Sequence, residues 1–448
     1  MHKRSIKSAH RDIENGAPMV YNKKNHTTAP EEENMKGILS RILSLGLAAA
    51  AAVSTCGCGT SASAFSEKTT QEIVTDMGLG INLGNTLESC GSWINGTDVR
   101  SYETAWGSPV ITEDMIKGYK AAGFDTLRVP VAWSNLMTGD YDISPELMDR
   151  ADEIVGWAID ADMYVILNIH WDGGWWEKFP EDKDECMHKY ERIWTQISDR
   201  FSKYSEKLVF ESLNEEGGWD SLWNRYSGGT EGKKESFDLL NEINQKFVDI
   251  VRSSKGNNKK RHLLIAGYGT DVALTCDELF KMPDDPQNRC AVSVHYYTPS
   301  TFAILEKDAS WGKNRRTWGT DADLKELEKY MDMMKEHFVD KGIPVIIGEY
   351  GCPQKNKEKE SIHKYITSVA AAAYERDMCP VLWDVTNAFY NRYKAEFKDK
   401  DLLKDLMETK KIDRNTNAAV KAEPAKKDSK VRNSTVNKTK KKNNKNAA

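Results

Sequence analysis

The segment Leu208–Glu215, with the sequence LVFESLNE, begins as an apolar run and ends in an amide followed by a carboxylate. Seven other runs follow the same plan, each with a loop after it: Leu79–Asn85, Asp125–Val131, Tyr164–Trp171, His262–Tyr268, Ala291–Tyr297, Pro344–Tyr350 and Pro380–Val385. Runs that are apolar almost throughout, rather than at alternate positions, are typical of parallel strands covered on both faces.

Segments with helical periodicity lie between these runs: Ser144–Ala161, Met187–Tyr204, Ser236–Ser253, Asp321–Lys341 and Ser361–Arg376. Eight strand-and-helix units in one chain predict an α/β protein of the (β/α)₈ TIM barrel type. A doubly wound open sheet is the competing fold. It is disfavoured because no glycine-rich phosphate loop follows the first run.

The chain is expected to hold one such domain, at residues 65–410, between flanks of different composition. Residues 1–34 are polar without periodicity and predict a disordered leader. Residues 35–64 combine Lys36 and Arg41, an apolar stretch and a final Ala62-Ser63-Ala64, which predicts a secretory signal. Cys56 is an alternative site for a lipid anchor. We therefore expect a secreted or cell-surface protein without a membrane span in its mature chain.

The charge distribution separates the body of the chain from its C-terminal end. The formal net charge is -5, and residues 421–448 carry ten Lys/Arg against two Asp/Glu, so the other 420 residues carry -13. An acidic body argues against nucleic acid as a partner. Residues 411–448 predict a basic disordered tail. The six cysteines from residue 65 onward contain no C-x-x-C pair, which leaves a Cys276–Cys290 disulfide or free thiols as alternatives.

Polar side chains accumulate where the predicted strands end, at the barrel rim that carries active sites. The endings are Asn82-Leu83-Gly84-Asn85, Leu127-Arg128-Val129-Pro130, Asn168-Ile169-His170-Trp171, Ser212-Leu213-Asn214-Glu215, Val294-His295-Tyr296-Tyr297, Gly348-Glu349-Tyr350 and Leu382-Trp383-Asp384. Two of them offer glutamates, Glu215 and Glu349. Glycoside hydrolysis requires such a pair, because one carboxyl protonates the leaving oxygen while the other attacks or activates water.

This ordered set of endings, between about Thr70 and Tyr393, resembles glycoside hydrolase family 5, and within it the endo-β-1,4-glucanases of anaerobic bacteria. The resemblance implies a retaining enzyme on a (β/α)₈ barrel that needs no cofactor. It implies that Glu215 is the acid/base and Glu349 the nucleophile. It also implies that Arg128 and Tyr297 touch the nucleophile. The residues that it implies as substrate contacts are Asn85, Arg128, His170, Asn214, His295, Tyr297 and Trp383.

The sequence departs from the common family pattern at three positions. Glu216 replaces a proline, Trp171 follows His170 where a second histidine is frequent, and Val385 follows Asp384 where asparagine is frequent. Glu216 competes with Glu215 as the acid. It is rejected because neighbouring strand residues point to opposite sides and because Asn-Glu is the family's fixed pair.

The substrate and the function have open alternatives at this point. Xyloglucan, mixed-linkage β-glucan, xylan or mannan are alternative substrates, and a catalytically inactive glycan-binding barrel is an alternative function.

We expect a monomer. We also expect no metal, since His170 and His295 lack a third histidine and a carboxylate at ligand spacing. About half of the loop tryptophans are expected to stack on sugar rings: Trp171, Trp175, Trp176, Trp219, Trp223, Trp311 and Trp318.

Overall fold

Eight parallel strands close into a barrel in the computed structural model, which describes residues 65–414. In barrel order the strands are β1 (Gly80–Asn82), β2 (Thr126–Val129), β3 (Tyr164–Asn168), β4 (Leu208–Glu211), β5 (Leu263–Asp271), β6 (Cys290–Tyr296), β7 (Val345–Tyr350) and β8 (Cys379–Leu382). Strand β8 pairs with β1 through Gly80–Val381 and Ile81–Leu382. The predicted (β/α)₈ fold is confirmed.

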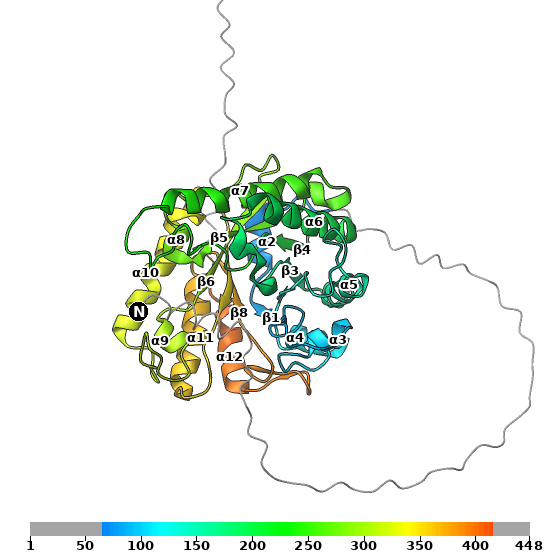
Figure 1. Ribbon diagram of the computed structural model, residues 1–448. Coiled ribbons are helices and arrows are strands. Elements are labelled where there is room, and N and C mark those ends of the chain that lie inside the picture. Colours follow the sequence, from blue (N-terminus) through cyan, green and yellow to red (C-terminus); the bar gives the residue numbers. More distant parts are fainter. Residues whose placement is uncertain (1–64, 415–448) are drawn as a thin grey trace, which may run out of the picture. The chain divides into compact units, whose positions relative to one another are not determined.

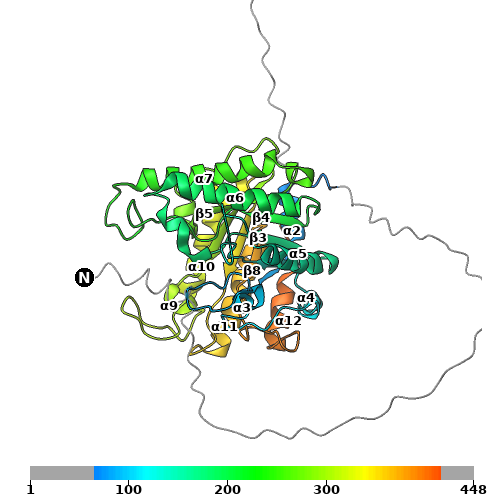
Figure 2. The same ribbon diagram turned by 45° about the vertical axis from the view of Figure 1, so that its right-hand side comes forward.

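Helices surround the strands, as Figures 1 and 2 show from two directions. The long ones are α4 (Glu113–Ala121), α5 (Pro145–Asp160), α6 (Lys183–Phe201), α7 (Lys233–Ser253), α10 (Asp321–His337), α11 (Lys359–Tyr374) and α12 (Lys400–Thr409). The short ones are α2 (Thr70–Asp76), α3 (Val99–Glu103), η1 (Asp172–Lys178), η2 (Gly256–Lys259), α8 (Val272–Thr275), α9 (Ser300–Ala303) and η3 (Val339–Lys341). A hairpin of β9 (Tyr390–Asn391) and β10 (Glu396–Phe397) precedes α12.

The predicted helices agree with the observed ones to within a few residues at each end, but several strands are shorter than predicted. Strand β4 ends at Glu211, four residues before Glu215, and β1 ends at Asn82. The chain stays apolar beyond these points because the first loop residues, such as Leu213 and Leu83, are also buried. An apolar run therefore marks burial here, and the strand ladder occupies only part of it.

The inside of the barrel holds an apolar cluster that is separate from the main core. Side chains from β3 to β8 form it together with Ile73 and Val74 of α2 and with Met77, which follows that helix. Helix α2 begins with a capping box between Thr69 and Glu72, which satisfies orphan backbone donors at its first turn. Figure 1 shows α2, in blue, beside the strands, where its apolar face fills one end of the barrel.

Arg261, two residues before β5, joins β4 to the end of α6. Its guanidinium is fully buried and donates to the carbonyls of Phe201, Tyr204, Ser205 and Leu208. Carbonyls at a helix C-terminus have no partner within the helix. A single arginine thus satisfies the backbone at the point where α6 turns into β4.

The described chain continues slightly past the predicted domain limit at residue 410. Ile412 packs against the main core, and the Arg414 guanidinium lies 3.9 Å from the ring centroid of Tyr374. The predictions for residues 1–34, residues 35–64, Cys56 and most of the basic tail concern residues outside the described range. Within residues 65–414 no helix is both long and apolar enough to span a membrane. Cys276 and Cys290 are free thiols and do not form the disulfide that was one of the two alternatives.

Candidate active site

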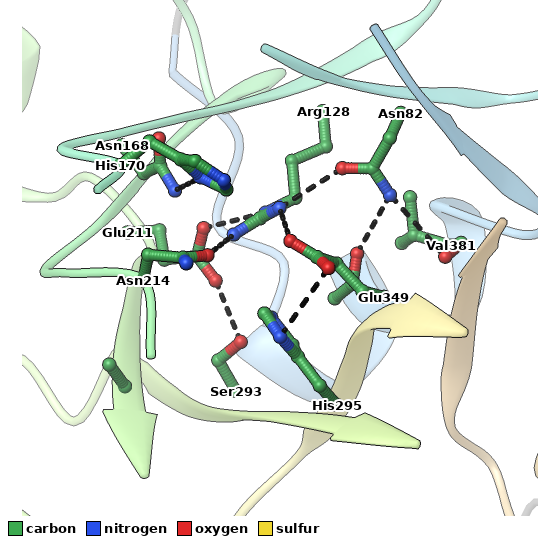
Figure 3. Close-up of polar contacts among 12 residues, drawn as sticks. Asn82, Arg128, Asn168, His170, Glu211, Asn214, Ser293, His295, Glu349 and Val381 are labelled. Atoms are coloured by element: carbon green, nitrogen blue, oxygen red, sulfur yellow. Dashed lines mark hydrogen bonds and ion pairs between the residues drawn. The ribbon is translucent and has the colours of Figure 1, made fainter. Parts of the chain in front are cut away.

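A layer of polar side chains crosses the barrel above the apolar cluster, with Arg128 of β2 at its centre (Figure 3). Arg128 is completely buried. Its Nε donates to Glu211 Oε2 at 2.7 Å, its Nη1 to Glu349 Oε1 at 2.7 Å and to Asn82 Oδ1 at 3.0 Å, and its Nη2 to Asn214 Oδ1 at 2.9 Å. One guanidinium therefore joins β1, β2, β4 and β7 and orients two of the residues predicted for the site.

Glu349 is held at both of its carboxylate oxygens. Oε1 accepts from Arg128, and Oε2 accepts from the Tyr297 hydroxyl at 2.9 Å. A guanidinium and a phenol that both donate to a carboxylate stabilise its charged form and fix its direction. The predicted contacts of Arg128 and Tyr297 with Glu349 are thus present.

Glu215 lies on the loop after β4, and its carboxylate faces that of Glu349. His295 Nδ1 is 2.6 Å from Glu215 Oε1 and 3.7 Å from Glu349 Oε2. One oxygen of each glutamate and a His295 ring nitrogen all lie within 4.8 Å of one another. This separation is close to the roughly 5–5.5 Å of retaining glycosidases and shorter than the roughly 6.5–9.5 Å of inverting ones.

Glu216 is fully enclosed and is bound to the backbone of its own loop. Its Oε2 accepts from the backbone N–H of Asn214 at 2.5 Å. Burial raises the pKa of Glu216 well above its usual range, and backbone N–H groups only partly offset that effect. The sequence argument against Glu216 relied on strand alternation, which does not apply because β4 ends at Glu211. The physical reason is instead that Glu216 folds back onto its own loop.

His170 and Trp383 form one wall of the site. Their rings are stacked with centroids 5.9 Å apart and planes 5° apart. Gly84 permits this arrangement, since a Cβ at that position would lie 2.9 Å from the Trp383 ring. The indole of Trp383 is partly exposed. A partly exposed indole next to two carboxylates offers a flat apolar surface for a sugar ring.

Two neutral groups complete the electrostatics of the site. Burial, and then the charge of Glu349, raise the pKa of Tyr297 well above its usual range, so the phenol keeps its proton. Burial, and then the charge of Arg128, lower the pKa of His170 well below its usual range, so its ring is uncharged at neutral pH. Proton transfer in the site is thereby left to other groups, among which Glu215 has the required position.

The three donors Glu215, His295 and Glu349 are also the set that a cation would use. Both oxygens of Glu349 already accept hydrogen bonds, and Arg128 supplies positive charge at that carboxylate. We therefore interpret the cluster as a site for proton transfer and carboxylate attack.

The structure brings most of the predicted residues together, but Asn85 and several tryptophans have other surroundings. Asn85 adopts a left-handed backbone conformation (φ 59°) and donates its N–H to Glu88 in its own loop. Four of the loop tryptophans are buried in the core and have no ring face free for a sugar: Trp176, Trp219, Trp223 and Trp318. Trp171, Trp175 and Trp311 are partly exposed.

Sequence reasoning assigned no role to three residues of the polar layer: Asn82, Glu211 and Ser293. All are fully buried within strands. Glu211 accepts from Arg128 and, through Oε1, from the Ser293 hydroxyl at 2.7 Å. A signal was available, because Glu211 is a charged residue inside the apolar run Leu208–Glu215, and a buried charge requires a partner.

Comparison with known proteins places this geometry among glycan hydrolases. Residues 90–389 match the cellulase family, glycosyl hydrolase family 5. An endoglucanase A of Paenibacillus barcinonensis is 33% identical over 76% of this chain and 90% of its own. A xyloglucan-specific endo-β-1,4-glucanase of Bacteroides ovatus is 33% identical over 70% of this chain and 65% of its own. The solved structure of a broad-specificity endoglucanase from an uncultured bovine rumen ciliate superposes with a TM-score of 0.70, at 35% identity, over 77% of this chain and 99% of that one.

The uncharged state of His170 can be tested directly. We expect the ¹³Cε1 signal of His170, assigned by comparison with the His170→Asn variant, to stay at its neutral position as the pH is lowered from 8 through the range in which an ordinary histidine takes up a proton. The unfolded chain takes up this proton near the ordinary pKa of about 6.5, so His170 should also make the fold less stable as pH falls below that value. A titration of the folded-state signal with a midpoint above pH 6 would contradict this.

Proposed function

Because the chain belongs to glycosyl hydrolase family 5, we propose that it is an endo-acting β-1,4-glucanase that cleaves with retention of anomeric configuration. One observation carries the proposal: Glu215 and Glu349 face each other with oxygens within 4.8 Å, while Arg128 and Tyr297 both donate to the Glu349 carboxylate. This spacing suits direct attack by a carboxylate and is too short for a water between the carboxylate and the sugar.

In the first step Glu349 is the nucleophile and Glu215 the acid. A Glu349 oxygen forms a bond to the anomeric carbon while the glycosidic C–O bond breaks, and the Glu215 proton moves to the leaving oxygen. His295 supports the transfer, because its Nδ1 lies 2.6 Å from Glu215 Oε1 and holds that carboxyl in position. This step releases one part of the glycan and leaves the other part bound to Glu349 as a covalent ester.

In the second step water replaces the enzyme at the anomeric carbon. Glu215, now a carboxylate, removes a proton from the water, and the bond between the sugar and Glu349 breaks. Asn214 is proposed to bind the 2-hydroxyl group of the sugar through the amide nitrogen, since its Oδ1 is already bound to Arg128. Trp383 is proposed to lie under the same sugar ring.

The remaining parts of the proposal are the polymer that is cleaved and the location of the protein. An acidic body with partly exposed indoles at the rim supports a neutral glycan, and β-1,4-linked glucosyl units are the substrate that we propose. Xyloglucan is the second candidate, on the strength of the Bacteroides ovatus relative. The basic, apolar and small-residue pattern of residues 35–64 supports export to the cell surface or medium.

The function is tested by measuring viscosity and reducing ends on soluble cellulose derivatives, mixed-linkage β-glucan, xyloglucan, xylan and mannan. We expect viscosity to fall before many reducing ends appear, with xylan and mannan at least about tenfold slower than the best β-glucan. The Glu349→Ala variant serves as the inactive control, and Glu360→Ala, which changes an exposed glutamate of α11, as the matched active one. Binding without hydrolysis of any polymer would favour the inactive glycan-binding barrel.

The roles of the two glutamates are separated by substrates with different leaving groups. Glu349→Ala should lose on the order of 10⁴-fold or more on every substrate. Glu215→Ala should lose about 10²- to 10⁴-fold on polysaccharide but retain the first step on a dinitrophenyl β-cellobioside, whose leaving group needs no proton. Azide should then restore turnover and yield a β-glycosyl azide.

Glu216→Gln is the neighbouring control for this experiment. Because burial raises the pKa of Glu216 well above its usual range, the amide resembles the neutral acid and still accepts from the Asn214 N–H. We expect its polysaccharide activity to stay within about tenfold of wild type. Azide rescue of a Glu216 variant, without rescue of Glu215→Ala, would move the acid/base role by one residue.

A further inference from the structure

Glu211 is a buried carboxylate that the catalytic steps above do not use. It is the last residue of β4, and its side chain is completely shielded from solvent. Oε2 accepts from Arg128 Nε at 2.7 Å, and Oε1 accepts from the Ser293 hydroxyl at 2.7 Å. Figure 3 shows the Arg128 guanidinium between Glu211 and Glu349. Two carboxylates therefore share one buried cation.

The charge of this cluster changes during a retaining reaction. When the ester forms, Glu349 loses its negative charge, whereas Arg128 keeps its positive charge because a guanidinium does not deprotonate in proteins. Arg128 has no exposed surface, and an unpaired charge in such a place is strongly unfavourable. Without another anion, the intermediate would therefore be destabilised by the isolated cation.

We propose that Glu211 is a positioning residue that acts as the permanent counter-ion of Arg128 and so allows Glu349 to become neutral and charged again in each cycle. The inference rests on the proposed nucleophilic role of Glu349. Glu211 reaches the reacting atoms only through Arg128. Its contact with Nε also fixes the plane of the guanidinium, which directs Nη1 toward Glu349 and Nη2 toward Asn214.

A second consequence concerns the resting enzyme. A carboxylate that receives the full charge of a guanidinium is stabilised as an anion and is a weaker nucleophile. Arg128 is also paired with Glu211, so Glu349 feels only part of the positive charge of the guanidinium. Arg128 can therefore orient Glu349 without fully stabilising it as an anion. Removing the charge of Glu211 should therefore make protonation of Glu349 harder and its esterification slower.

The test follows formation of the ester itself. A dinitrophenyl 2-deoxy-2-fluoro-β-cellobioside forms a bond from its anomeric carbon to a Glu349 oxygen as dinitrophenolate leaves with the bonding electrons, and the fluorine slows release of the sugar. Intact mass gives the trapped fraction, and the release of dinitrophenolate gives the rate. We expect Glu211→Gln to be trapped at least about tenfold more slowly than wild type, with the acidic limb of the rate moved about one pH unit lower.

Three variants distinguish charge from packing. Glu211→Asp keeps the negative charge but places it one methylene further from Arg128. The acidic limb of its trapping rate should stay as in wild type. Ser293→Ala removes a hydrogen bond but no charge and should also keep it. Glu103→Gln neutralises a second buried glutamate, paired with Arg150 at 2.7 Å outside the site, and should change thermal stability without moving the limb.

The outcomes separate this inference from the proposed function. If wild-type enzyme is not trapped on Glu349, the proposed function fails. If wild type is trapped but Glu211→Gln reacts at the same rate with the same acidic limb, Glu211 is not the counter-ion. If Glu211→Gln does not fold, Glu211→Asp tests the inference instead. An acidic limb of its trapping rate that differs from that of wild type by more than about half a pH unit would contradict the inference.

Discussion

The buried guanidinium of Arg128 is the constraint on which the rest of the site depends. A cation without solvent contact is tolerated only among acceptors and anions, and here Glu211, Glu349, Asn82 and Asn214 fill that role. These partners come from β1, β4 with the loop after it, and β7, so one charge determines the relative positions of several barrel segments. Glu349, the proposed nucleophile, and Asn214, which precedes the proposed acid, are both oriented by the same group.

Around this charge the barrel is organised in levels. The apolar cluster that includes α2 excludes water from below, and low polarity there strengthens the interactions of the polar layer above it. At the site itself the Glu215 side chain is more exposed than that of Glu349, at 17% against 7%. The proposed acid/base is thus nearer to solvent, and the proposed nucleophile is nearer to Arg128.

The fold and the two glutamates could be predicted because their signals are local. Apolar runs with polar ends indicate parallel strands and a common rim, and Asn214-Glu215 and Gly348-Glu349-Tyr350 lie in an order typical of one family. Glu211 is marked only as a charge inside an apolar run, and Ser293 is not marked at all. Sequence does not show whether a strand residue faces the helices or the barrel interior, or at which level it lies. The tryptophans illustrate the same limit: Trp171 and Trp219 both follow strands, yet only Trp171 is partly exposed.

Stereochemistry tests the central claim, which is that Glu349 attacks the sugar directly. Proton NMR of the products, recorded before mutarotation, identifies the anomer that is released first from a soluble β-1,4-glucan. A carboxylate pair with oxygens within 4.8 Å predicts two successive displacements and hence the β-anomer. First appearance of the α-anomer would mean that water attacks without a covalent intermediate, and the account of Glu349 would be wrong.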